Sequence, residues 1–158
     1  MRVYLNRYGL VAFTVDTSIT LDQAASKLGL RIDATDALTL KDAVRSEEDR
    51  IGVHNDCLLL SSVDELQFFN EPLSDLTLRL MRMIPDGRGC AVYNYTIPDL
   101  YGYAYFEKGS IKRIKHGENM EVWVDRGDRL TFEEHDPPVS EMCDQLVQLV
   151  TGEELPVL

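Results

Sequence analysis

Tyrosines alternate with small or apolar residues over positions 101–106, which read Tyr-Gly-Tyr-Ala-Tyr-Phe. A period of two places successive side chains on opposite faces of a β-strand, so this segment predicts a strand. The turn-like segment Glu107–Ser110 follows, and the basic segment Ile-Lys-Arg-Ile-Lys covers residues 111–115. Together these segments predict an antiparallel hairpin.

Other short apolar segments predict further strands. Residues 6–9 and 125–128 each contain glycine among polar residues and are expected to form turns between them. Because consecutive strands are joined by such short turns, we expect an antiparallel sheet. The additional strands are expected over residues 3–5, 10–15, 57–60, 90–97, 120–124 and 130–132.

Apolar residues recur at helical spacing in three segments, 20–28, 73–84 and 138–150. The first begins with Thr20 and Gln23, which have capping-box spacing. The third follows Asp136, the residue before two prolines, which we expect to be the N-cap.

Each expected helix has one apolar stripe that must be buried, most simply against one face of the sheet. The mixed segment 33–50 is expected to form a loop and a short helix. The sequence therefore predicts an α+β fold, with a mainly antiparallel sheet and about three helices packed on one face in two layers. A length of 158 residues is typical of one domain, so we expect a single domain over residues 1–158.

The composition is that of a globular protein, with 44% hydrophobic and 27% charged residues. No apolar segment reaches the length of a membrane-spanning helix, and polar residues follow too soon after Met1 for a signal peptide. Cys57, Cys90 and Cys143 form no C-x-x-C pair, so we expect reduced, buried thiols. These features predict a cytoplasmic protein that does not associate with a membrane.

Acidic residues are concentrated near the end of the chain. Residues 117–158 contain eleven carboxylates and two arginines, and the net charge of the whole chain is −11. We expect no nucleic-acid ligand, because phosphate binding requires a dominant basic surface. The acidic segment suits a basic protein partner through electrostatic steering, although acidic side chains also serve solubility alone.

The chain contains no G-x-S-x-G, Walker or dinucleotide-binding pattern. His54, Asp56 and Cys57 leave open a small hydrolase or ligand-binding domain, although Cys57 begins an apolar run and is expected to point inward. Glu133–Asp136 is dense in metal-binding side chains, but alternate side chains diverge in a strand-to-helix turn. We therefore expect no catalytic residues, no metal and no cofactor.

Tyrosine side chains are common both at interfaces and on half-buried strands. We expect Tyr103 in the core or at its rim, and Tyr95 and Tyr101 exposed to solvent. The 101–106 strand also leaves open a self-assembling structural module, in which this strand pairs across a homodimer.

An aromatic strand, a tight turn, a strand bearing an arginine and a glycine turn before acidic residues follow one another between Asp99 and Glu134. The residues of this order are Tyr101–Phe106, Gly109, Arg113, Asp125–Gly127, Leu130 and Glu133–Glu134. The order resembles small, acidic, uncharacterised bacterial proteins, and similar α+β proteins are found among the immunity proteins that neutralise bacterial toxins. The resemblance implies a protein-binding role and carries no catalytic residues across.

The sequence therefore predicts a non-catalytic protein-binding module, in the form of a toxin-immunity protein that occludes a basic partner. This hypothesis depends on the acidic final segment, the lack of catalytic motifs and the resemblance. Expected partner contacts are two tyrosine anchors and six carboxylates: Tyr95, Tyr101, Glu118, Glu121, Asp125, Asp128, Glu133 and Glu134.

Overall fold

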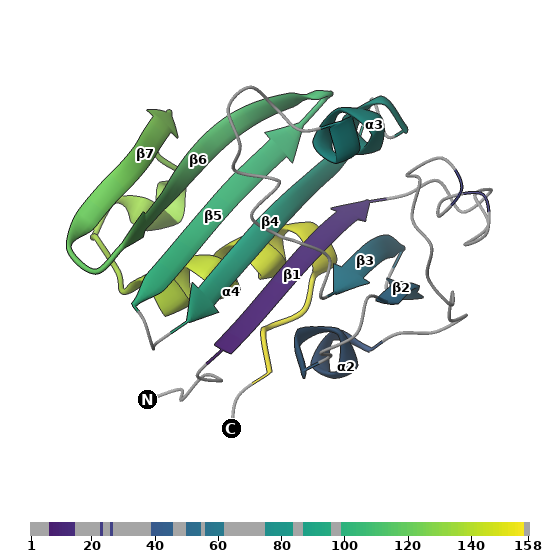
Figure 1. Cartoon of the computed structure of the whole chain (residues 1–158), viewed down its shortest axis with the longest axis horizontal. Helices are drawn as coiled ribbons and strands as arrows, with labels where there is room; N and C mark the ends of the chain where they lie inside the picture. Colours follow the sequence, from purple (N-terminus) through teal and green to yellow (C-terminus); the bar gives the residue numbers. More distant parts are fainter. Residues whose placement is uncertain are drawn as a thin grey trace.

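The computed structural model describes residues 7–14, 23, 26, 39–45, 50–54, 56–61, 75–83, 87–95 and 99–156. Within them, seven strands form one antiparallel sheet in the order β2-β3-β1-β4-β5-β6-β7, accompanied by helices (Figure 1). This architecture confirms the expected α+β class. The strands are β1 (Arg7–Thr14), β2 (Arg50–His54), β3 (Cys57–Ser61), β4 (Arg88–Tyr95), β5 (Leu100–Glu107), β6 (Ser110–Glu118) and β7 (Glu121–Gly127).

Strand β5 lies inside the sheet and pairs with β4 on one side and β6 on the other. Its turn into β6 consists of Lys108 and Gly109, whose φ angles of 51° and 75° are those a two-residue hairpin turn demands. The predicted 101–115 hairpin is thus confirmed. Since β5 already has a neighbour on each side, the alternative in which residues 101–106 pair across a homodimer is wrong.

One face of the sheet is covered by α4 (Val139–Thr151) and α2 (Leu40–Arg45). Apolar residues along α4, among them Leu146 and Val150, pack against side chains of β1, β4 and β5 such as Leu10 and Val92. Figure 1 shows α4 running behind the sheet. The structure confirms the predicted helix over 138–150 and the short helix expected within 33–50.

The opposite face has an apolar cluster of its own, in which Met81 of α3 (Asp75–Met83) is buried together with Phe13, Leu58 and Phe106. In Figure 1, α3 lies in front of the sheet, on the side away from α4. The expectation that all helices cover one face is therefore wrong for α3. The physical reason is that β3 is buried along its whole length and β5 along most of it, so both faces of the sheet need a cover.

The predicted helix over 20–28 lies outside the described residues, except that Gln23 and Ser26 are helical. The expected strand over 3–5 also lies outside them. Residues 7–9, expected in a turn, belong to β1 and pair with β4. Residues 125–127, also expected in a turn, complete β7, where the Arg113 side chain donates to two of their carbonyls.

The segment after β7 also differs from expectation. Residues 131–133 form a short 3-10 helix, η2, rather than a strand, because the Glu133 carboxylate accepts the Leu130 N–H at 2.5 Å. Asp136 is not the N-cap of α4, a position that Pro138 occupies. The backbone of Asp136 is left-handed, with a φ of 47°, and its carboxylate accepts a hydrogen bond from Arg129.

Gly127 provides a test of how closely β6 and β7 approach. Its φ is 84°, and an added Cβ would lie 2.1 Å from the Lys112 carbonyl oxygen, whereas Gly109 has a φ of 75° and open space around it. We expect Gly109→Ala to cost about 1 kcal/mol for its left-handed backbone, and Gly127→Ala to cost clearly more because of the added clash. Urea unfolding of both variants measures the difference. Equal losses would contradict the close approach.

Candidate functional site

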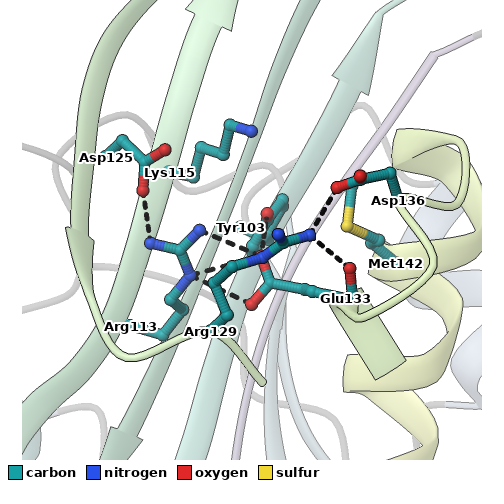
Figure 2. Close-up of a pocket in the computed structure, with 8 residues that line it drawn as sticks. All are labelled: Tyr103, Arg113, Lys115, Asp125, Arg129, Glu133, Asp136 and Met142. Carbon is teal, nitrogen blue, oxygen red and sulfur yellow. Dashed lines mark hydrogen bonds and ion pairs between the residues drawn. The ribbon is translucent and has the colours of Figure 1, made fainter. Parts of the chain in front are cut away.

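The side chain of Arg113 on β6 is almost completely buried, with 2% of its surface exposed. Its Nε and Nη2 donate to the Glu133 carboxylate at 3.0–3.2 Å. Its Nη1 donates to Asp125 at 2.5 Å and to the Arg126 carbonyl at 3.0 Å. Figure 2 shows the guanidinium between the two carboxylates. A single side chain thus joins β6 to both β7 and η2.

Glu133 is buried to the same extent and receives hydrogen bonds from two strands and from the segment before η2. Besides Arg113, the Tyr103 hydroxyl of β5 donates to it at 2.5 Å, and the Leu130 N–H donates at 2.5 Å. The Arg113 guanidinium carbon lies 5.9 Å from the centre of the Tyr103 ring, within the range of a cation–π contact. We call Tyr103, Arg113, Asp125 and Glu133 the Arg113 network.

The electrostatics of the network hold each group in one protonation state. Burial alone would raise the pKa of Glu133, but hydrogen bonds from Arg113, Tyr103 and Leu130 outweigh it and lower the pKa. The hydrogen bond from Arg113 likewise lowers the pKa of Asp125. Burial, with Glu133 beside it, raises the pKa of the Tyr103 hydroxyl. A general acid or base needs a pKa near the working pH, so these directions do not favour proton transfer at this site.

A pocket of about 180 Å³ opens beside the network. At its rim, Arg129 donates to the Glu133 carbonyl and to the Asp136 carboxylate (Figure 2). The polar groups at its base bond mainly to one another, so the arrangement is suited to fixing β7 and η2 rather than to holding a ligand. The residues that line the pocket are Tyr103, Arg113, Lys115, Asp125, Arg129, Glu133, Asp136 and Met142.

The structure separates the predicted partner contacts into two sets. Tyr101 is 8% exposed, so its expected exposure is wrong, and Glu133 is enclosed in the Arg113 network. Tyr103 is fully buried, which confirms its predicted place in the core. Tyr95 is half-buried against the second apolar cluster, so its expected exposure is only partial. Tyr101 is buried because β5 is covered on both faces, and the alternation of the sequence alone does not reveal this cover.

The other predicted contacts lie at the surface. Glu121, Asp125, Asp128 and Glu134 are exposed, and Glu118 is half-buried. The sheet order brings the first three together along β7 and the residue after it, and Glu118 faces Glu121 across the hairpin. These carboxylates stay a predicted contact surface.

Sequence reasoning missed the apolar side chains that lie among these carboxylates. Met120, Val122 and Trp123 expose 98%, 48% and 45% of their surfaces. The Trp123 ring meets the His116 ring edge to face, with centroids 5.7 Å apart. The available signal was the only tryptophan of the chain, placed between glutamates and aspartates. We call residues 118–128 the β7 hairpin.

The grouping of His54, Asp56 and Cys57 does not form a nucleophilic site in the described structure. His54 is the cross-strand neighbour of Cys57, but its Nε2 contacts Glu153. The Cys57 thiol is 1% exposed and donates to the Val150 carbonyl at 3.3 Å. Burial, with Asp56 nearby, raises its pKa to about 11. A nucleophile needs exposure and a thiolate, and this thiol lacks both.

Comparisons with protein-family models, with curated proteins and with solved structures found no match to this chain. The resemblance to immunity proteins therefore stays a prediction. Within the described residues, no cluster of three or more His, Cys, Asp or Glu side chains is placed to hold a metal ion. Over the same part of the chain, none of the helices combines the length and apolar character needed to cross a bilayer.

The Arg113 network predicts a large loss of stability when one partner of the buried ion pair is removed. Glu133→Gln leaves the Arg113 charge with one buried carboxylate fewer, and we expect a loss of about 3 kcal/mol at neutral pH. Chemical unfolding measures it, with the exposed neighbour variant Glu134→Gln as a control expected to change little.

Acidification gives a second readout of the same pair. Because the pKa of Glu133 is lowered in the folded state, its contribution is complete above the ordinary value of 4.5 and is lost as the pH falls through the folded value. The stability difference between the wild type and Glu133→Gln should therefore shrink below pH 4.5. A difference that does not depend on pH would contradict an ionised Glu133.

The buried thiols predict slow alkylation of the native protein. All three cysteines are buried and unpaired by disulfides, and burial raises the pKa of Cys57 to about 11 and that of Cys143 to about 12. At pH 8 we expect iodoacetamide to leave the native chain unmodified and to add three groups in denaturant, counted by mass spectrometry. Rapid native labelling at Cys57 would restore the hydrolase alternative.

Proposed function

We propose that this protein is a non-catalytic binding module that occludes a basic protein partner, in the manner of a toxin-immunity protein. The observation that carries the proposal is the β7 hairpin, where exposed apolar side chains lie among exposed carboxylates. Met120, Val122 and Trp123 supply the apolar part, and Glu121 and Asp128 are among the acids beside them.

The charge of the hairpin is only partly balanced by the chain itself. Within the described residues, Asp125 pairs with Arg113, whereas Glu118, Glu121 and Asp128 take part in no ion pair. Glu118 and Glu121 even face each other across the hairpin, where like charges repel. A basic partner would relieve this repulsion and be steered toward the surface from a distance.

The apolar side chains provide what charge alone does not. Tryptophan is enriched among residues that dominate binding energy, because its large rigid surface is removed from water on contact. About half of the Trp123 surface is exposed, and its ring packs against the ring of His116. This contact holds the orientation of the Trp123 side chain before a partner binds. An ordered anchor loses less conformational freedom on binding than a mobile one.

The described polar groups favour binding over catalysis. The Arg113 network is hydrogen-bonded internally, and the Cys57 thiol is buried with a raised pKa. Neither supplies a group whose protonation state changes near neutral pH.

The proposal predicts a partner whose retention depends on charge. From a lysate of the native cells, the tagged protein should retain a basic protein in stoichiometric amount at low salt and release it at high salt, because the Debye length falls from about 10 Å at 0.1 M to about 3 Å at 1 M. The double variant Glu121→Lys with Asp128→Lys should retain much less of it, with slower association and weaker salt dependence.

A matched control separates the β7 hairpin from total charge. Glu141→Lys with Glu154→Lys changes the net charge equally at two exposed positions outside the hairpin. Equal loss of the partner in both double variants would indicate a general charge effect, and unchanged retention in the β7 variant would rule out the acidic surface.

A further inference from the structure

We propose that β7 is a docking strand, along which the partner adds an extended basic segment as an eighth strand of the sheet. This inference rests on the proposed function and specifies how the partner is held. Strand β7 ends the sheet order, and in the described residues it pairs with β6 alone. Over residues 121–125 its outer edge therefore presents main-chain N–H and C=O groups that no described strand satisfies, and such an edge is a template for a further strand.

The side chains on and beside β7 select what can pair there. Charged residues on an edge strand suppress pairing with neutral or like-charged strands. Residues 118–128 carry four carboxylates and one arginine. A second copy of the chain would bring the same excess of negative charge to the new pairing and is disfavoured by repulsion. A segment with alternating lysine or arginine side chains meets the opposite condition, so the edge admits a basic strand and rejects its own copy.

The apolar positions set where that strand would be anchored. The pairing of β6 with β7 shifts register between His116 and Gly117, which face Val124 and Val122, so Trp123 lies at the irregularity. A bulge re-aims the side chain it contains and locally increases the twist of the strand. Trp123 packs on His116 there and keeps nearly half of its surface exposed at the edge. An apolar side chain in the added strand would cover it.

The test uses Trp123 itself, because it is the only tryptophan of the chain and reports on this strand alone. Three octapeptides are titrated against the full chain while its fluorescence is recorded: alternating lysine and valine, alternating glutamate and valine, and the lysine–valine sequence with every main-chain amide N-methylated. The first can form a strand and is basic. The second keeps the strand propensity with reversed charge, and the third keeps the side chains and the charge but has no main-chain N–H to donate along a ladder.

The expected result is a saturable fluorescence change with the lysine–valine peptide only. Glu121→Lys should weaken that binding about fivefold, because one cross-strand attraction becomes a repulsion, whereas Glu141→Lys on α4 should leave it within about twofold. Isotope-edited contacts between peptide and β7 main-chain amides would confirm the added strand.

Other outcomes overturn the docking strand and leave the proposed function to its own experiment. Equal binding of the N-methylated peptide would show that charge acts without strand pairing. No response to either basic peptide would remove the edge as a docking site, while a salt-released partner in the pull-down would still support the binding module. A dimer of the chain whose formation alters Trp123 fluorescence without peptide would make a second copy the occupant.

Discussion

The fixed position of β7 depends on the burial of one guanidinium group. An arginine enclosed in protein must replace the water it loses with hydrogen bonds to oxygen, and Arg113 does so through Glu133, Asp125 and the main chain of β7. Each replacement ties down a different segment. The last strand, the turn that follows it and the η2 helix are therefore tied together by one charge, in addition to the apolar contacts that Val124, Leu130 and Phe132 make with the two clusters.

This constraint gives a physical role to the residues on which the predicted resemblance to small acidic bacterial proteins depends. Tyr103, Arg113, Asp125 and Glu133 are all among them, and in the structure they form the Arg113 network. The main chain of two further residues of this set contributes to the network. The Leu130 N–H donates to Glu133, and Gly127 adopts the left-handed φ with which β7 ends. In this chain, that order of residues therefore specifies how a strand and a turn are fixed to a sheet. Such an arrangement does not by itself determine a function, because function depends on the site that a fold presents.

The sequence was sufficient where local periodicity decides the structure. The alternation over 101–106 and the helical spacing over 138–150 each predicted an element that the structure contains. It was insufficient where a distant side chain decides it. Residues 125–127 look like a turn until Arg113 bonds to their carbonyls, and residues 130–132 look like a strand until Glu133 bonds to Leu130.

The same limit applies to the candidate site. The period of two correctly places Tyr101 and Tyr103 on one face of a strand, but it does not tell whether helices cover one face of the sheet or both. The prediction that Tyr101 is exposed was therefore wrong. Trp123 was overlooked because its place on an edge strand depends on the order of strands in the sheet. Strand order arises from long-range pairing, which a single sequence does not encode in any local pattern.

The carboxylates near the two ends of the β6–β7 pair have different effects on stability, depending on whether an arginine neutralises them. Carboxylates that face inward, Glu133 and one oxygen of Asp125, are neutralised by Arg113 and stabilise the fold. The carboxylates of Glu118 and Glu121 face each other across the hairpin without a neutralising arginine, and their repulsion destabilises the hairpin. A chain that keeps such repulsion beside exposed apolar side chains has not optimised this surface for stability. Surfaces that sacrifice stability in this way are where function is expected, and this is why we propose the locked β7 strand as the element that presents it.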